Sequence, residues 1–362
     1  MSHHVEIRSI NKTDDNKNGR RSNIEALRAV SCMMVVLLHL NAWLYDINEL
    51  SGFYRILYTV FNVLTRFAVP CFMLITGTFI FDNAVKKGCR KFYKDAIKKV
   101  LLPTILFSMI YVLYGLLKGS LEGVLVFKDL MIDWVKGIPF GHMWYMYMLI
   151  GFYFVVPPLC LLREKMGKFA WGICGIGCVI LACLLYNGSL IAPIWPLCWI
   201  QYVGYFIIGD CISKCLQYEW FANRKTIKLF CVLLAIITFF VMVIYSFICL
   251  KSNLVYNFQP QNILTFIFSV SIYSYAISSN GTNNSFIKLI AKHSGYIFFL
   301  HGGAVNIIEI LMNRLHWQYN HPLLILVTTY WIVLLSCVIV SAGINGTISK
   351  LNVKFTNRRK VV

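Results

Sequence analysis

The segment that decides the fold runs from Ser22 to Leu44 and reads SNIEALRAVSCMMVVLLHLNAWL. Its length and apolar content are typical of a helix that crosses a bilayer, since a hydrocarbon core about 30 Å thick needs roughly 20 apolar residues. It also contains three ionisable side chains, Glu25, Arg28 and His39. Such side chains are costly inside a membrane unless they have a partner or a cavity, so the segment predicts both a membrane span and a functional site.

The spacing of these three residues places them on one face of the predicted helix. Arg28 and His39 are eleven positions apart, about 20° past three full turns and roughly 16 Å along the axis. Glu25 precedes Arg28 by three positions and could pair with its guanidinium. Structural alternatives stay open: Ser22 and Glu25 fit a capping box, and Arg28 could extend to the inner headgroups. His39 could be a hydrogen-bonded packing residue, but it lies past the midpoint of the span.

Nine further segments extend this pattern along the chain. The protein has 362 residues, of which 58% are hydrophobic and 14% charged, and this excludes an ordinary globular, fibrous or disordered protein. Ten segments are long and apolar enough to span: 24–45, 53–82, 99–117, 142–162, 168–186, 195–213, 227–250, 262–280, 295–314 and 322–343. The second is too long for one perpendicular span and contains Pro70, so it is expected to be tilted or kinked.

The basic residues give the predicted orientation. The net charge is +19, which would suit a nucleic-acid partner, but 26 of the 34 Lys and Arg residues fall in the two tails and alternate loops. The other loops carry five, and Arg28, Arg55 and Arg66 lie within spans. This distribution predicts an all-α polytopic membrane protein with about ten spans, both termini cytoplasmic and no nucleic-acid partner.

The predicted organisation is one membrane domain with two tails. Residues 1–23 form a cytoplasmic tail without the apolar core of a signal peptide, residues 24–343 the transmembrane domain, and residues 344–362 a basic cytoplasmic tail. Ten of the thirteen cysteines lie inside apolar runs, and no Cys or His spacing fits a zinc site. The cysteines are therefore interpreted as packing residues, and no metal is expected.

The first span resembles the integral-membrane acyltransferase 3 family, whose signature is an Arg, ten residues and a His in the first helix. Here those residues are Arg28 and His39. Four later segments agree with the family in chain order: AVPCFMLITGTFIF (68–81), GHMWYMYMLIGFYFVVPPL (141–159), YVGYFIIGD (202–210) and SGYIFFLHG (294–302). The family usually has Ser-Gly in the second span, and Thr76-Gly77 retains the hydroxyl. The resemblance covers nearly the whole chain and implies the same ten-span architecture.

The resemblance implies acyl transfer from a cytoplasmic donor, usually acetyl-coenzyme A, with no bound cofactor. His39 would act as general base or transient acyl carrier, with Arg28 and Glu25 beside it. The donor phosphates would favour Arg28 and the basic loop 83–99, and the expected donor-binding residues are Arg90, Lys94, Lys98, Lys99 and His301. The family motif here is commonly built on Arg, and lysines bind phosphate without bidentate geometry. His301 could equally be a core residue.

Acceptor-binding candidates lie deeper or on the outer side. They are Arg66, Thr76, His142, Trp144 and Tyr145. Arg66 could stabilise an oxyanion or bind the acceptor sugar, or form an ion pair with Glu309 or Asp210. Trp144 and Tyr145 could stack on sugar rings or belong to an interfacial aromatic belt.

The combined expectation is an O-acyltransferase of the cell membrane. Its acceptor would be an envelope carbohydrate, such as a surface polysaccharide, a lipid-linked glycan or a peptidoglycan precursor. Some family members carry an extracytoplasmic hydrolase-like domain, so this chain would act alone or with a separate extracytoplasmic partner. The alternative is a transporter or exporter of a glycan or small anion that uses the same polar residues. A membrane-embedded sensor is a weaker third possibility, since no signalling domain is attached.

Overall fold

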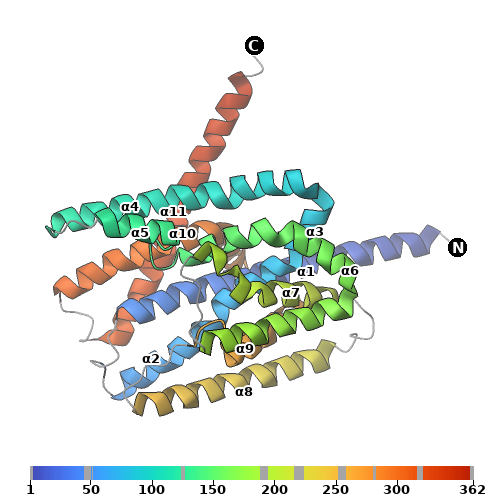
Figure 1. Ribbon diagram of the computed structural model, residues 1–362, viewed down its shortest axis with the longest axis horizontal. Coiled ribbons are helices and arrows are strands. Elements are labelled where there is room, and N and C mark those ends of the chain that lie inside the picture. Colours follow the sequence, from blue (N-terminus) through green and yellow to red (C-terminus); the bar gives the residue numbers. More distant parts are fainter. Residues whose placement is uncertain are drawn as a thin grey trace. The chain divides into compact units, whose positions relative to one another are not determined.

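The computed structural model is all-helical over the residues that it describes (Figure 1). The backbone is described for residues 3–44, 50, 52–123, 127–187, 195–215, 224–251, 258–279, 283–315 and 321–358. Side chains are described for residues 22–44, 50, 52–123, 127–186, 196–215, 225–250, 258–279, 283–315 and 321–347. No strand occurs in these ranges, so the predicted all-α class is confirmed.

The chain divides into two compact units, and each is described by itself. The first unit comprises residues 1–27 and 66–281, and the second comprises residues 28–65 and 282–362. The helix α1 (His3–Trp43) passes from the first unit into the second after Leu27. The first unit contains α3 (Ala68–Ala96), the π-helical turn η2 (Ile97–Leu101), α4 (Leu102–Leu121), α5 (Phe127–Lys136), α6 (Trp144–Asn187), the 3-10 turn η3 (Trp195–Leu197), α7 (Trp199–Cys215), α8 (Arg224–Lys251) and α9 (Ile263–Ser278). The second contains α2 (Gly52–Leu64), α10 (Ser285–Leu315) and α11 (Pro322–Arg358).

The helices cover all ten predicted spans. By length and composition, six helical stretches of the described residues can cross a membrane. Two of these stretches, Gly52–Leu121 and Trp144–Tyr186, are long enough for two crossings each. Gly88 and Gly167 interrupt them with φ angles of 70° and 73°, which glycine adopts without a Cβ penalty. The shorter helices α7 and α9 cover the two remaining segments, so the chain is a multi-pass membrane protein.

Two local expectations can be compared with the helix boundaries. The long second segment is divided into α2 and α3 by the 3-10 turn η1 (Thr65–Phe67), and no break occurs at Pro70. Pro70 lies in the first turn of α3, where its missing N–H removes no helical hydrogen bond. The capping-box alternative at Ser22 is wrong, because α1 is already helical from His3 onward.

The close packing of α3 on α7 organises the first unit. Gly77 faces the Phe206 carbonyl, and Gly209 faces the Leu74 carbonyl. A Cβ built on Gly77 would lie 2.0 Å from one oxygen, and one on Gly209 2.2 Å from the other. Small residues at helix crossings in membranes allow this approach of two backbones. The Tyr273 hydroxyl on α9 donates to the Gly209 carbonyl at 3.1 Å, which joins a third helix to the crossing.

Helix directions agree with the ten-span order. In the second unit, Cys32 on α1 bonds to the Ser294 carbonyl on α10, and His39 packs against His301. Both pairs advance by seven residues, so α1 and α10 run in the same direction. The first and ninth spans of a ten-span protein must do so, since an even number of crossings separates their starting points.

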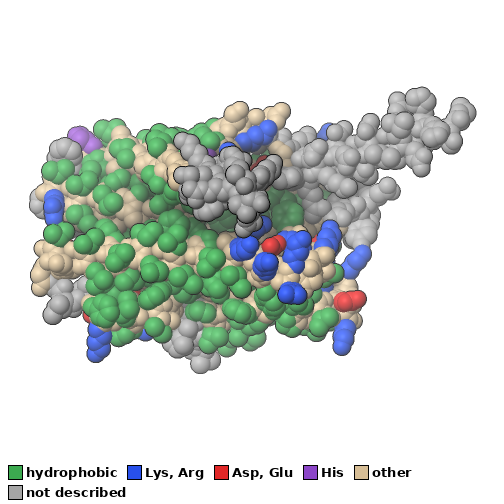
Figure 2. Space-filling model, turned by 90° about the horizontal axis from the view of Figure 1, so that it is seen from above, with side chains coloured by type: hydrophobic (Ala, Val, Ile, Leu, Met, Phe, Trp, Pro, Cys, Tyr) green, Lys and Arg blue, Asp and Glu red, His purple; other side chains and the backbone are tan. Residues whose placement is uncertain are grey.

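The surface is that of a protein surrounded by lipid. Large hydrophobic side chains are exposed on most helices, for example Leu106, Leu113, Ile176 and Phe240. In the space-filling view hydrophobic side chains cover large parts of the visible surface, and Lys and Arg side chains cover much less of it (Figure 2). All thirteen cysteines are free, and six of them are buried. The burial of these six agrees with their interpretation as packing residues.

Candidate active site

Two histidines from distant parts of the sequence meet in the second unit. His39 on α1 and His301 on α10 have ring centroids 5.1 Å apart, with their planes inclined by 41°. The Trp43 ring lies 5.0 Å from the His39 ring, one helical turn further along α1. His39 is partly exposed, whereas His301 is 0% exposed. The sequence singled out both histidines but placed His301 with the donor, and the structure places it against His39.

The His301 ring is held by its own helix. Its Nδ1 lies 3.0 Å from the carbonyl oxygen of Ile297, one turn earlier on α10. A carbonyl oxygen can only accept a hydrogen bond, so Nδ1 carries the proton. The other ring nitrogen, Nε2, then has a lone pair in the neutral imidazole and can accept a proton.

The remaining catalytic candidates also lie on α1. Arg28 is in the second unit with His39 and is partly exposed, and Glu25 lies three positions earlier, in the part of α1 that belongs to the first unit. Because α1 is continuous from Glu25 to His39, Glu25, Arg28 and His39 lie on one face of the helix, as their spacing predicts. Near the far end of α1, Asn41 fixes the helix to α2, because its side-chain Nδ2 donates to the Tyr58 carbonyl at 3.1 Å.

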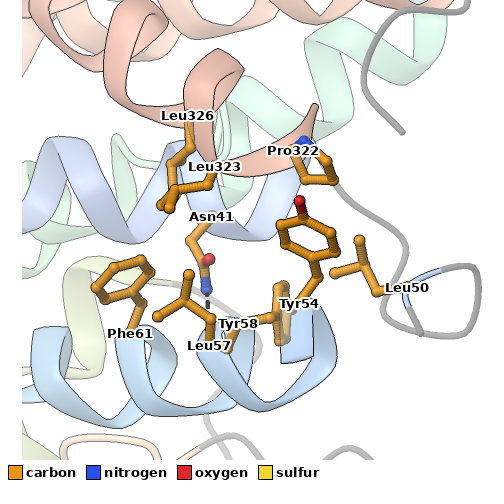
Figure 3. A pocket seen from close by; sticks show the side chains of 9 residues that line it. All are labelled: Asn41, Leu50, Tyr54, Leu57, Tyr58, Phe61, Pro322, Leu323 and Leu326. Carbon is orange, nitrogen blue, oxygen red and sulfur yellow. Dashed lines mark hydrogen bonds between the residues drawn. The ribbon is translucent and has the colours of Figure 1, made fainter. Parts of the chain in front are cut away.

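A small cavity lies beside the Asn41–Tyr58 hydrogen bond, between α1, α2 and α11 (Figure 3). Its volume is about 20 Å³, which is space for about one water molecule. Tyr54, Leu57 and Leu326 are among its lining residues. The cavity is therefore too small for a substrate. It lies where α1, α2 and α11 pack together, on the C-terminal side of His39 in α1.

The predicted donor-binding residues of the basic loop form one helical segment of the first unit. Arg90 and Lys94 lie on α3, and Lys98 and Lys99 lie in η2; all four are exposed. Lys87 pairs with Asp95 at 2.6 Å, and this hydrogen bond holds the pKa of Asp95 below its usual range. The remaining positive charges outnumber the single carboxylate, so the segment suits an anionic ligand.

A larger cavity lies beside this basic segment. It has a volume of about 380 Å³ and is lined by Tyr93, Ala96, Ile97, Val100, Leu101, Ile150, Tyr153 and Phe154. The lining residues Tyr93 and Ile97 directly precede Lys94 and Lys98 in the chain. The segment therefore presents an apolar cavity and exposed ammonium groups on neighbouring faces. The π-helical turn at Ile97–Leu101 is a feature often found at functional sites.

The acceptor-binding candidates all lie in the first unit. Arg66 is in η1 and partly exposed, and the Thr76 hydroxyl donates to the Phe72 carbonyl at 2.8 Å. His142 is 2% exposed and packs edge-on against Tyr111 at 5.3 Å and Phe140 at 5.6 Å. Its ring is thus enclosed by aromatic side chains.

Trp144 and Tyr145 begin α6 and belong to a cluster that the sequence did not reveal. The Trp144 ring lies 5.5 Å from the ring of Tyr202 on α7. Gln261, just before α9, donates to the Tyr202 hydroxyl and to the Gln201 amide oxygen, both at 2.8 Å. Gln201 and Gln261 lie near the ends of apolar segments. Because they are uncharged, the sequence did not single them out as candidate site residues.

A network of two carboxylates and two cations links α3, α6 and α7. Arg163 bonds to Asp82 at 2.8 Å and to Asp210 at 3.0 Å. Lys214 bonds to the same two carboxylates at 3.2 Å and 2.6 Å. The Trp171 indole also donates to Asp210 at 3.2 Å. The sequence named Asp210 only as an alternative partner for Arg66, and the charge-balanced network is a finding of the structure.

Replacing Asp210 with asparagine should destabilise the first unit by about 2 kcal/mol, because the partly exposed Arg163 and Lys214 each lose one of their two charged partners. Asp210 is 1% exposed, so water cannot replace the lost charge. The measurement is thermal unfolding of the detergent-solubilised variant. Asp129→Asn, on an exposed position of α5, is the matched control and should unfold like the parent. Equal stability of both variants would contradict a stabilising network.

The fold and the site define a multi-pass α-helical membrane protein with two imidazoles in contact among its spans. An acyltransferase domain, the acyltransferase 3 family, matches residues 21–342. The chain therefore belongs to the acyltransferase 3 family, as the sequence motifs predicted. Neither a search of curated proteins nor a search of solved structures gave a match.

Proposed function

We propose that this protein is an O-acyltransferase of the cell membrane that moves an acetyl group from acetyl-coenzyme A to a hydroxyl of an envelope carbohydrate. The observation that carries the proposal is the pair formed by His39 and His301 inside a domain of an acyltransferase family. Imidazoles serve acyl transfer in two ways, since they remove the acceptor proton or carry the acyl group.

The donor side of the proposal rests on charge. Acetyl-coenzyme A carries several phosphates, which would bind the exposed Arg90, Lys94, Lys98 and Lys99. With both termini and this segment on the cytoplasmic side, the donor would bind from the cytoplasm. The apolar cavity beside the segment offers space for uncharged parts of the donor. Arg28, about three turns before His39 on α1, would hold a donor phosphate or carbonyl nearer the reaction.

The acceptor side rests on aromatic and amide groups. Trp144 is partly exposed and offers a face on which a sugar ring could stack. The buried Tyr145 and Tyr202 rings and the Gln201 and Gln261 amides would support it from behind. Arg66, Thr76 and His142 are further acceptor-binding candidates. We assign the acceptor to the extracytoplasmic side, where envelope glycans are found, either directly or through a separate extracytoplasmic partner.

The test is mass spectrometry of surface glycans from cells that do or do not produce the protein, supplied with isotope-labelled acetyl groups. The expected result is a glycan carrying the labelled acetyl increment only when the protein is present. A purified preparation in lipid nanodiscs should also release free coenzyme A from acetyl-coenzyme A when acceptor is added. If glycan appears at the surface with its mass unchanged and no coenzyme A is released, the protein is an exporter and the proposal is wrong.

A further inference from the structure

We infer that His301 is a second catalytic residue, the general base, and that His39 is the acyl carrier. The inference rests on the proposed function and assigns separate roles to the two imidazoles at its site. The sequence left the role of His39 open between these two possibilities and placed His301 with the donor. Three observations within the second unit favour the division.

The first observation is the fixed position of the pair. Cys32 bonds to the Ser294 carbonyl seven residues before the two histidines on both helices. With α1 and α10 running in the same direction, this bond and the contact of the rings hold the two helices in one register. The imidazoles therefore face each other as a consequence of helix packing and not of a flexible loop. A site on rigid elements keeps the geometry that catalysis needs.

The second observation is the tautomer of His301. The Ile297 carbonyl holds the proton on Nδ1, which leaves the lone pair on Nε2. An imidazole whose other nitrogen donates to a fixed acceptor is oriented to act as a base. A nucleophile, a base beside it and a third group that orients the base is the arrangement common to nucleophilic catalysis. His39, His301 and the Ile297 carbonyl match these three roles.

The third observation is the difference in exposure. His301 is fully buried, so its ring could exchange a proton with a neighbouring group but has no space for an acyl group. His39 is partly exposed and can receive a group that arrives from outside the helix pair. Close packing thus assigns proton transfer to His301 and acyl transfer to His39.

The chemistry balances over two steps. In the first, a ring nitrogen of neutral His39 attacks the thioester carbonyl, the C–S bond breaks, and coenzyme A leaves as a thiolate with the bonding electron pair. In the second, the acceptor oxygen attacks the acyl-imidazole, and its proton passes to Nε2 of His301. The C–N bond breaks and its electron pair returns to His39. The buried His301 then passes the proton to the restored lone pair of the partly exposed His39, which releases it to water. The thiolate takes up a proton, so the products are an ester and coenzyme A.

The test separates the two steps with His301→Gln and rapid acid quenching after mixing with labelled acetyl-coenzyme A. His301→Gln should still become acetylated on His39, which also shows that the variant is folded. Its transfer to the acceptor should fall by about 10²-fold to 10⁴-fold. His293→Gln is the matched control, because His293 is a buried histidine of α10 bonded to Ser341, and it should behave like the parent.

Each other outcome has a defined meaning. Unchanged transfer in His301→Gln would overturn the inference, as would loss of acetylation together with transfer in a variant that remains folded. His301→Asn repeats the test if the glutamine variant does not fold. An unmodified glycan with the parent protein would instead reject the proposed function itself.

Discussion

Replacing His39 with alanine is expected to lower the rate of acetyl transfer by about 10³-fold or more, because the group that carries or activates the acyl transfer is removed. The His39 ring packs against the Trp43 and His301 rings. Its removal eliminates these side-chain contacts and leaves the backbone of α1 in place. The measurement is the initial rate with labelled acetyl-coenzyme A in nanodiscs, at donor concentrations above the KM.

His321→Ala is the control for this experiment. His321 is an exposed histidine directly before α11 and is not among the candidate site residues. Its replacement should leave the rate unchanged. A His39→Ala variant that is inserted, monodisperse and as active as the parent would show that acyl transfer does not depend on His39.

Replacing Gly77 with alanine is expected to destabilise the first unit by about 3 kcal/mol or more, at the upper end of the usual cost of overpacking. The added Cβ would lie 2.0 Å from the Phe206 carbonyl oxygen, and both positions belong to helix backbones that cannot move separately. The helices α3 and α7 would have to separate, which also strains the carboxylate network of Asp82 and Asp210. Thermal unfolding and the yield of monodisperse protein are the measurements.

Gly177→Ala provides the matched control within an apolar helix. Gly177 lies on α6, and a Cβ there would meet nothing within 4 Å. Alanine is the better helix former, so this variant should be as stable as the parent or slightly more stable. If Gly77→Ala unfolds at the same temperature as Gly177→Ala, the close approach of α3 and α7 does not contribute to stability.

The sequence predicted the elements of this fold well because a bilayer makes a strong demand on the local sequence. Every span must satisfy its own backbone in a helix and present apolar side chains, so hydropathy alone located ten segments that the structure finds helical. The sequence did not predict that a 3-10 turn at Thr65–Phe67 divides the second segment, because Pro70 fits the first turn of a helix and does not by itself mark a break.

The candidate site was predicted in part. The period of the helix showed that Arg28 and His39 share a face, and this needs only local geometry. Nothing local connects His39 with His301, since 262 positions separate them and several spans lie between. Likewise, Asp82, Arg163, Asp210 and Lys214 come from three helices, and no pattern in one helix shows that they meet.

The sequence by itself determined that the chain is a helical membrane protein of one acyltransferase family, with an arginine and a histidine on one face of its first span. These properties follow from composition, helical period and motif, which are encoded in neighbouring residues. Only the tertiary structure decided which helices touch, and through them the partner of His39, the tautomer of His301 and the glycines at the crossing of α3 and α7. Helix association in a membrane depends on close packing between surfaces from distant segments, and that complementarity appears only when the surfaces are placed together.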